Sequence, residues 1–345
     1  MFPQWLLIFF ERILKHYKEK KESRRILQRL GKREIKNVLI VYDNLCSPPT
    51  YGDYMIVVFL ARYFTSQDIA VSFVIVDGEY RSDWGHLNTE EVQKLVTDYV
   101  KISKLLLDSK LATVEVLTSA QLQARVRACL ANGDDVPFLN NVINRAQVYC
   151  HAFNLLSNLC AKAGQNHLNR FLLTFDELAG KVTFKKPNKP YITWHCRYSE
   201  KWGRDRNTGD DEFLRVHTCL KALYPHHGIM VVSDALGCNY FRQIAIKYSL
   251  ECIFSKDYCD TLMGDGALIL GSAFFFVIKG GGIAIFPIFS KMPFELVFNT
   301  VNECEFASGK LTSWASGEQL FRRLSRSNDY LPTLGIPILT GELTS

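Results

Sequence analysis

The sequence lacks most of the short motifs that mark well-known catalytic and metal sites. It contains neither H-E-x-x-H nor a Cys/His cluster with the spacing of metal ligands. No G-x-S-x-G elbow is present to mark a serine hydrolase. The G-x-G-x-x-G fingerprint of dinucleotide sites and the G-x-x-x-x-G-K-[ST] fingerprint of P-loops are also absent. We therefore expect no bound metal and no cofactor.

The N-terminus lacks the features of a secretory signal. Phe2–Phe10 is apolar, but the charges follow it instead of preceding it, and no small-residue cleavage site comes after it. The run is also too short to span a bilayer. The ten cysteines are scattered without any C-x-x-C pair. We interpret them as reduced, buried thiols of a cytoplasmic protein.

Net charge is absent from most of the chain and is concentrated at one end. Residues 1–36 hold eleven Lys and Arg against four Glu, which gives +7, so the other 309 residues carry −1 of the total +6. A neutral body argues against nucleic acid as a partner. Apolar residues from Trp5 to Leu14 recur near helical spacing beside this charge. The pattern favours an interfacial helix on an anionic membrane, peripheral on its inner face. A helix packed on the domain, or a frayed terminus, is the alternative.

Strand and helix patterns alternate in both halves of the chain. In the first half we expect strands at 37–42, 71–77 and 112–117, and helices at 54–64, 88–110, 119–131 and 138–164, before a connection at 166–190. In the second half we expect strands at 191–196, 229–233, 251–254, 274–278 and 295–298, and helices at 209–223, 239–248, 260–271, 283–291 and 316–326. This order predicts an α/β protein of two Rossmann-like doubly wound domains facing a cleft, at 37–180 and 181–345.

The most informative cluster of polar residues follows the first strand of the second half, in ITWHCRYSEKWGRDR (192–206). The strand delivers His195 and Arg197 to its carboxyl end, and the loop beyond adds Arg204. The planar guanidinium group suits a diphosphate and remains charged at any working pH. His195 is a candidate for a hydrogen bond to phosphate or for proton transfer. The alternative is that Trp194 and His195 fill a surface between domains while the arginines are solvated.

A second cluster follows a later strand, in FFFVIKGGGIAIFPIFSKMP (274–293). Lys279 ends the hydrophobic strand, and Gly280, Gly281 and Gly282 lead into an apolar helix. Glycines let a backbone approach a ligand, and a helix start offers N–H groups to an anion. The alternative is a tight strand–helix turn that needs glycine for its geometry alone. Pro287 lies one turn into the expected helix, so we expect that helix to be short or kinked.

Weaker candidates lie at two other strand ends. Ser233 and Asp234 follow the strand IMVV, where a ribose, a base or a loop backbone is within reach. In the first half, Asp43 and Asp53 flank the loop after the first strand. Either carboxylate is a candidate for the base that activates an acceptor, although capping of a helix also explains Asp53.

The second half also resembles a known enzyme family. WHCRY at 194–198 is similar to the H-x-R-R motif of the α-1,6-fucosyltransferases and the nodulation fucosyltransferase, with Tyr198 in place of the second arginine. VVSDALG is similar to the second motif of that group, and Phe274–Gly282 occupies the position of its third. The first half looks like the opening βαβ unit of two-domain (GT-B) glycosyltransferases. The resemblance implies that Arg197 contacts the phosphates of a nucleotide sugar, with GDP as one possible nucleotide.

These observations together predict a glycosyltransferase. Since no D-x-D triplet is present, we expect it to be metal-independent, with a nucleotide-sugar as substrate and a glycan or lipid-linked acceptor. Arg197, His195 and Asp53 are the predicted catalytic residues. The predicted donor-binding residues are Arg197, Arg204, Ser233, Asp234, Lys279, Gly280, Gly281 and Gly282. The alternatives are another glycan-modifying transferase, such as a pyruvyl transferase, and a non-catalytic nucleotide-binding module at a membrane surface.

Overall fold

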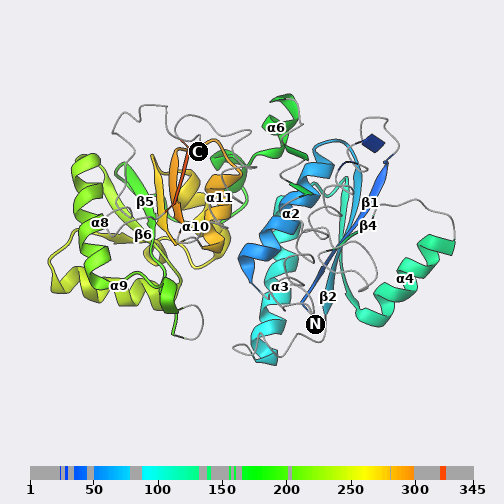
Figure 1. Ribbon diagram of the computed structural model, residues 1–345, viewed down its shortest axis with the longest axis horizontal. Helices are drawn as coiled ribbons and strands as arrows, with labels where there is room; N and C mark the ends of the chain where they lie inside the picture. Colours follow the sequence, from blue (N-terminus) through cyan, green and yellow to red (C-terminus); the bar gives the residue numbers. More distant parts are fainter. Residues whose placement is uncertain are drawn as a thin grey trace, which may run out of the picture. The chain divides into compact units, whose positions relative to one another are not determined.

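The chain divides into two compact units, residues 1–171 and 172–345. The computed structural model describes residues 35–44, 50–77, 88–131, 138–140, 165–200, 204–279, 281–298 and 319–323, with 24, 28, 29, 155, 156, 159 and 160. Figure 1 shows the elements of each unit. The predicted membrane-surface helix of residues 1–36 lies almost entirely outside the described residues. No helix in the part that is described is both long enough and apolar enough to cross a bilayer.

The first unit is built on a parallel sheet whose described strands are ordered β3-β2-β1-β4. Its strands are β1 (Asn37–Asp43), β2 (Ala70–Asp77), β3 (Ala112–Thr118) and β4 (Phe138–Asn140). Its helices are α2 (Tyr51–Thr65), α3 (Thr89–Leu106), α4 (Ser119–Ala131) and α6 (Gln165–Phe171). β1 lies inside the sheet and is buried from Val38 to Tyr42, as expected for a short β-branched run covered on both faces.

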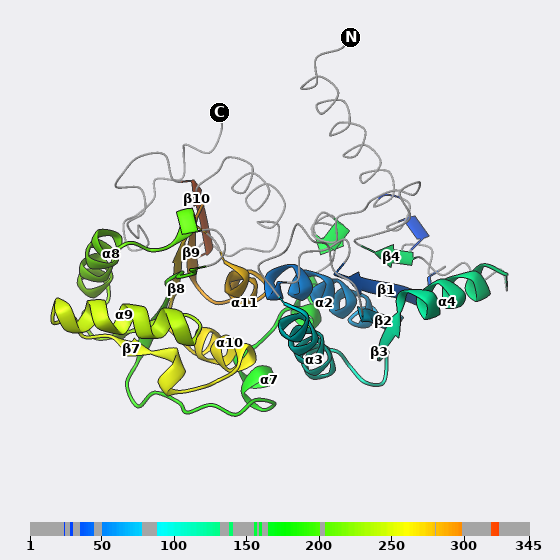
Figure 2. The ribbon, with the colours of Figure 1, turned by 90° about the horizontal axis from the view of Figure 1, so that it is seen from below.

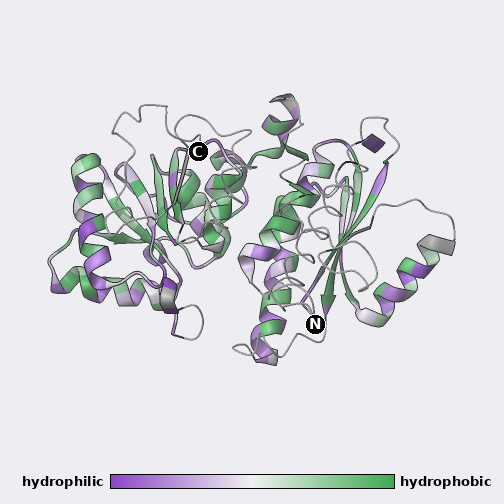
Figure 3. Cartoon of the chain, viewed as in Figure 1, coloured by the Kyte–Doolittle hydropathy of each residue, from purple (hydrophilic) through white to green (hydrophobic). Residues whose placement is uncertain are grey.

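Helix α2 is the most deeply buried helix of this unit. Nearly all of its side chains from Tyr54 onward are buried, and Figure 3 shows hydrophobic residues along most of its length. Arg62 lies within this buried face. Its guanidinium group donates to the carbonyls of Phe171 (2.6 Å) and Leu106 (3.0 Å), the last residues of α6 and α3. A cation suits helix C-termini, where backbone carbonyls lack partners, so Arg62 joins three helices.

The second unit contains a parallel sheet whose described strands are ordered β10-β9-β8-β5-β6-β7. Its strands are β5 (Tyr191–His195), β6 (Gly228–Val232), β7 (Ile253–Phe254), β8 (Phe275–Ile278), β9 (Phe294–Phe298) and β10 (Gln319–Arg323). Its helices are α7 (Phe175–Ala179), α8 (Asp210–Leu223), α9 (Ala235–Lys247), α10 (Leu262–Leu270) and α11 (Ile285–Ile288), with short 3-10 turns η2 (Arg204–Arg206), η3 (Ser255–Asp257) and η4 (Gly282–Ala284).

Numbered by their own order in the chain, these six strands lie 3-2-1-4-5-6, which is the Rossmann order. Alternate residues of β5 face opposite layers. Ile192 and Trp194 pack in a core with residues of α8 and α9, whereas the Tyr191 hydroxyl donates to Leu268 of α10 at 2.8 Å. Figure 2 shows the helices around this sheet. The predicted fold class, α/β with two Rossmann-like units, is confirmed by the parallel strand orders of both sheets.

Several predicted elements were wrong in type or extent. Residues 138–140 form β4, paired with Leu39–Val41 of β1, and not the start of a helix. Residues 319–323 form β10, paired with β9, where a helix was expected at 316–326. In both cases the partner strand is distant in sequence, and local spacing does not reveal it. The predicted connection 166–190 includes α6 and α7. Helix α9 begins four residues before the expected 239, because Asp234 caps it.

Candidate functional site

The strand order of the second unit defines where a ligand is expected. The two strands that follow β5 in the chain, β6 and β7, lie on one side of it. The next strands, β8 and β9, lie on its other side. The order therefore reverses between β5 and β8, which are hydrogen-bonded neighbours. In open parallel sheets, ligands bind beyond the carboxyl ends of the strands at this reversal. His195 ends β5 and Lys279 follows β8, so both sequence clusters reach the same point of the sheet.

His195 and Gly281 are in contact at the reversal. A β-carbon added to Gly281 would lie 2.6 Å from His195 Nε2, so the imidazole ring lies against the glycine backbone. On its other side, His195 Nδ1 is 2.9 Å from the carbonyl oxygen of Val232, at the end of β6. Burial, together with the nearby Arg197, lowers the pKa of His195 to about 4, against the opposing effects of the Val232 carbonyl and Asp234. The imidazole is therefore neutral at physiological pH.

Arg197 begins a loop whose two ends are fixed to each other. Its backbone N–H donates to Thr208 Oγ1 at 3.2 Å, and its carbonyl accepts from Thr208 N at 2.8 Å. Within the loop, next to this pair, the side chain of Asn207 accepts from Ser199 N and donates to the carbonyl of Ser199, both at 2.9 Å. Because the two ends of the loop are paired, the backbone of Arg197 is held beside the end of β5. Arg197 itself is half-buried.

Lys279 is in the same region, but its charge is already paired. Its ammonium group lies 2.9 Å from Glu212 Oε2 and 3.3 Å from the carbonyl oxygen of Asn207. Its backbone has a φ of 62°, a left-handed conformation unusual for a residue with a side chain. This conformation directs the chain from β8 into the glycine turn. Lys279 thus holds the Arg197 loop against the end of β8, and its role in donor binding stays a prediction.

The glycine turn is only partly as predicted. Gly280 lies outside the described residues, Gly281 is extended with φ 165°, and Gly282 begins η4. Instead of one helix over 283–291, the chain makes this 3-10 turn and the four-residue α11, which contains Pro287. So short a helix has little dipole to offer an anion. The absence of a side chain on Gly281 leaves room for the ring of His195.

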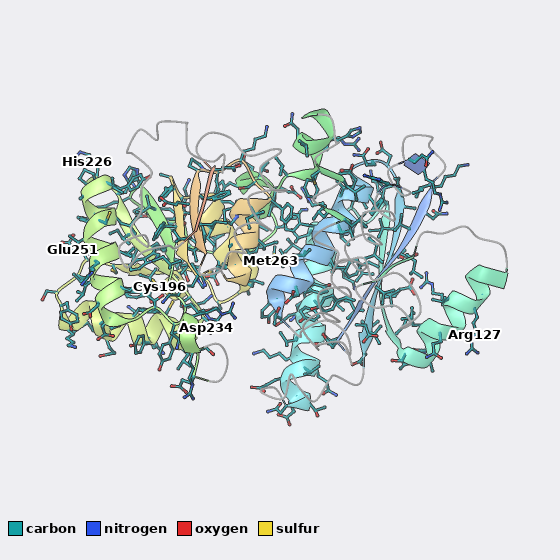
Figure 4. All side chains as sticks on the ribbon, viewed as in Figure 1. Arg127, Cys196, His226, Asp234, Glu251 and Met263 are labelled. Atoms are coloured by element: carbon teal, nitrogen blue, oxygen red, sulfur yellow. The ribbon has the colours of Figure 1, made fainter. Side chains whose placement is uncertain are left out.

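Ser233 and Asp234 join β6 directly to α9. The Asp234 carboxylate is the N-cap of α9 and accepts from Gly237 N at 2.7 Å. Ser233 is buried against the first turn, where Gly237 has no side chain to displace it. In Figure 4, Asp234 lies at the opposite end of this unit from His226, which precedes β6. Both predicted residues are thus at the carboxyl edge, with the Asp234 carboxylate capping the helix.

The aromatic residues around Arg197 are structural. Trp194 is completely buried and stacks on Phe213 of α8, with ring centroids 4.7 Å apart. Tyr198 stacks on Tyr240 of α9 at 4.0 Å, so the residue that replaces the second arginine of the family motif packs against a helix. Arg204 is exposed in η2, and its Nε donates to the carbonyl of Glu200. Arg204 therefore lies on the loop, with its guanidinium group open to solvent.

Asp53, the predicted catalytic base, belongs to the first unit. It lies in the first turn of α2, where it accepts a 2.7 Å hydrogen bond from the hydroxyl of Thr50, the N-cap residue. Burial raises the pKa of Asp53, although Thr50 acts in the opposite direction. The alternative that Asp53 caps the helix was wrong in its residue, because Thr50 is the N-cap and Asp53 accepts from the hydroxyl of that cap. A raised pKa is also what a general base requires.

Sequence reasoning missed the residues that support the site. Glu212 was not singled out, nor were Asn207 and Thr208, although they hold the Arg197 loop. The contact between His195 and Gly281 was also not predicted. The signal available in the sequence was the acidic start of α8, where Asp210, Asp211 and Glu212 follow a basic loop. Within the described residues, no group of three His, Cys, Asp or Glu side chains is placed to hold a metal ion.

No protein-family model matches the chain, and no curated protein matches it. Several solved structures are similar over most of their length. The glycosyl transferase family 9 protein of Veillonella parvula is 9% identical, with 83% of this chain and 86% of that chain covered and a TM-score of 0.41. The ADP-heptose LPS heptosyltransferase II of E. coli is 11% identical, with 88% and 95% covered and a TM-score of 0.40. MnaA of S. aureus with UDP is 12% identical, with 79% and 83% covered and a TM-score of 0.34. Similarity this distant carries no argument about activity.

The fold and the candidate site together define the class of this protein. The chain is an α/β protein of two Rossmann-like units, and the second unit has a strand reversal bordered by a neutral histidine, an arginine and a glycine turn.

Proposed function

We propose that the chain is a glycosyltransferase of the GT-B type, which transfers a sugar from a nucleotide-sugar donor without a metal ion. The observation that carries the proposal is the position of the His195–Gly281 contact and Arg197 at the strand reversal of a Rossmann-like unit. The resemblance of residues 194–198 to a donor-binding motif supports it. In glycosyl transfer the departing nucleoside diphosphate gains negative charge, and a fixed cation beside it lowers the barrier.

Within this proposal, Arg197 and the N–H groups of Gly281 and Gly282 bind the donor diphosphate. Ser233, close to the start of α9, lines the nucleoside side of the site. Asp53 on the first unit serves as the base that activates the acceptor. We retain GDP as one candidate nucleotide and a fucosyltransferase-like specificity as one candidate, although Tyr198 supplies no second cation.

The charge of the N-terminal segment bears on the acceptor and on the location of the protein. We propose a glycan or lipid-linked acceptor and a position at the inner membrane face, on the basis of the +7 charge in residues 1–36. Co-sedimentation with anionic liposomes, using the chain with and without residues 1–36, tests this part. Equal sedimentation of the two proteins would show that residues 1–36 do not bind the membrane.

A donor screen tests the proposed reaction. Nucleoside diphosphates and nucleotide sugars are added singly, and thermal unfolding is followed, because only a ligand that binds the folded state raises Tm. Transfer is then assayed with the donor that binds. Arg197→Ala is expected to reduce transfer at least 100-fold. The control is Arg215→Ala, an exposed arginine on α8, which is expected to retain full activity. Wild-type transfer by Arg197→Ala would remove Arg197 from the site.

The same screen separates the alternatives. Binding of phosphoenolpyruvate without any nucleotide sugar would favour pyruvyl transfer. Binding of a nucleotide without transfer to any acceptor tried would favour a non-catalytic module. EDTA is expected to leave transfer unchanged, and restoration of lost activity by a divalent cation would contradict the metal-independent mechanism.

A further inference from the structure

The hydrogen bond between His195 and Val232 determines which imidazole nitrogen carries a proton. The carbonyl oxygen of Val232 accepts from Cys196 N at 3.2 Å and lies 2.9 Å from His195 Nδ1. A carbonyl oxygen can only accept, so Nδ1 must be the protonated nitrogen. In a neutral imidazole the other nitrogen, Nε2, then has a free lone pair and acts as an acceptor.

The surroundings of Nε2 place this lone pair at the strand reversal. Nε2 is the His195 atom closest to the position of a β-carbon on Gly281, at 2.6 Å, so the ring edge is directed toward the glycine turn. A larger residue at 281 would occupy this space. The atom is therefore adjacent to the backbone that the proposed function assigns to the donor.

Burial, more than the charges around the ring, keeps the imidazole neutral. Arg197, beyond the end of β5, disfavours a second proton, whereas Asp234, from the β6–α9 connection, favours one. Burial acts in the same direction as Arg197 and outweighs Asp234 and the hydrogen bond to Val232, so the pKa of His195 is lowered to about 4. From the β8 side, Gly281 carries no charge, and the ammonium group of Lys279 is paired with Glu212. In the neutral ring, Nε2 is a hydrogen-bond acceptor, and so is a phosphate oxygen. Two acceptors cannot form a hydrogen bond with each other.

We propose that His195 Nε2 accepts a hydrogen bond from a hydroxyl group of the bound donor, and does not bind its phosphates. This refines the proposed function, on which it rests, by assigning phosphate binding to Arg197 and the glycine turn alone. The hydroxyl belongs either to the ribose or to the transferred sugar. His195 is then a specificity residue, because a donor without that hydroxyl leaves the buried acceptor unpaired.

Two substitutions separate the two nitrogens of the ring. In His195→Asn, the amide N–H can replace Nδ1–H toward Val232, but no atom replaces Nε2. In His195→Gln, the amide oxygen reaches the position of Nε2 and can accept the same hydrogen bond. We measure Kd by calorimetry, for the nucleotide sugar that the donor screen selects and for its nucleoside diphosphate, from pH 5.5 to 8. Circular dichroism verifies the fold of each variant.

The expected result is a wild-type Kd for the nucleotide sugar, whose phosphates do not titrate here, that stays constant within about twofold over this pH range. His195→Gln should bind within about threefold of wild type, and His195→Asn about tenfold more weakly, which is the effect of one hydrogen bond to a neutral group. If the hydroxyl belongs to the ribose, the nucleoside diphosphate shows the same loss. If it belongs to the sugar, only the nucleotide sugar does.

Other outcomes overturn the proposal. A wild-type affinity that weakens about tenfold as the pH rises from 5.5 to 7.5 would indicate an imidazolium bound to phosphate. Equal binding by both variants and wild type would show that Nε2 makes no contact. If either variant fails to fold, ¹⁵N NMR of the wild-type imidazole gives the answer, since a protonated Nε2 in the complex contradicts the proposal. Failure of every nucleotide and nucleotide sugar to bind wild type would instead contradict the proposed function itself.

Discussion

The ammonium group of Lys279 and the carboxylate of Glu212 form an ion pair of 2.9 Å that joins the end of β8 to the first turn of α8. Only 16% and 14% of the two side chains is exposed. Lys279 also donates to the carbonyl of Asn207, whose side chain holds Ser199. Because Asn207 and Thr208 close the loop that begins at Arg197, the ion pair fixes the position of that loop.

Breaking this ion pair should lower both stability and donor affinity. Lys279→Met leaves a mostly buried carboxylate without its cation, which is expected to cost about 3 kcal/mol of unfolding free energy. The double variant Lys279→Met/Glu212→Gln removes both charges and should recover most of that loss. Urea unfolding of the parent, both single variants and the double variant measures the coupling. Additive effects of the two substitutions would show that the pair contributes nothing as a pair.

Because Gly281 and His195 are in contact, a single methyl group added at position 281 should lower donor affinity and stability. Gly281 has an extended backbone that any residue can adopt, so only the 2.6 Å approach to His195 Nε2 opposes Gly281→Ala. The ring must move, and we expect donor affinity to fall about tenfold and stability by about 1–3 kcal/mol. The matched control is Gly209→Ala, because an added β-carbon there meets no atom within 4 Å. A Gly281→Ala protein with the parent's Kd would mean that the ring is not fixed by this contact.

Asp53 should show opposite effects on activity and stability. Burial raises its pKa above the value in the unfolded chain, so the folded state prefers the protonated form. The ionised carboxylate therefore opposes folding at pH 7, and stability from this group increases as the pH falls through the raised pKa. Asp53→Asn should be at least as stable as the parent at pH 7, while kcat falls about 100-fold and donor Kd is unchanged. Full activity of Asp53→Asn would exclude it as the base.

His195 should make the protein sensitive to mild acid. Its folded pKa of about 4 is lower than the ordinary 6.5, so the unfolded state takes up a proton first as the pH falls. Stability from the neutral ring is complete above pH 6.5 and is lost between pH 6.5 and 4. Between pH 7 and 4.5 the loss is about 2 kcal/mol, at 1.36 kcal/mol per pKa unit. Urea titrations of the parent and His195→Gln across this range compare the slopes, and identical slopes would mean that folding does not shift the pKa of His195.

The sequence predicted the strands that lie inside the sheets and the edge strands β3 and β7, but missed the edge strands β4 and β10. β1, β2, β5 and β6 are short apolar runs, because parallel strands covered on both faces need apolar residues throughout. Three-residue β4 and the polar β10 carry no such pattern. They are strands because β1 and β9 offer free edges to pair with. That information lies in distant residues.

For the candidate site, the sequence predicted positions at strand ends but not the contacts between residues. Residue chemistry at strand ends identified His195, Arg197 and Gly281, and the strand order brings all three to one edge of the second unit. The roles depended on contacts that no local pattern contains. Glu212 pairs with the charge of Lys279, Val232 determines the protonated nitrogen of His195, and the cap of α9 uses the carboxylate of Asp234.

A structure with a nucleoside diphosphate bound tests the central claim most directly. The account predicts that the two phosphates lie beyond the carboxyl ends of β5 and β8, in contact with the guanidinium group of Arg197 and the backbone of Gly281, with no metal ion between them. Phosphates bound elsewhere on either unit, with the reversal between β5 and β8 left empty, would contradict it.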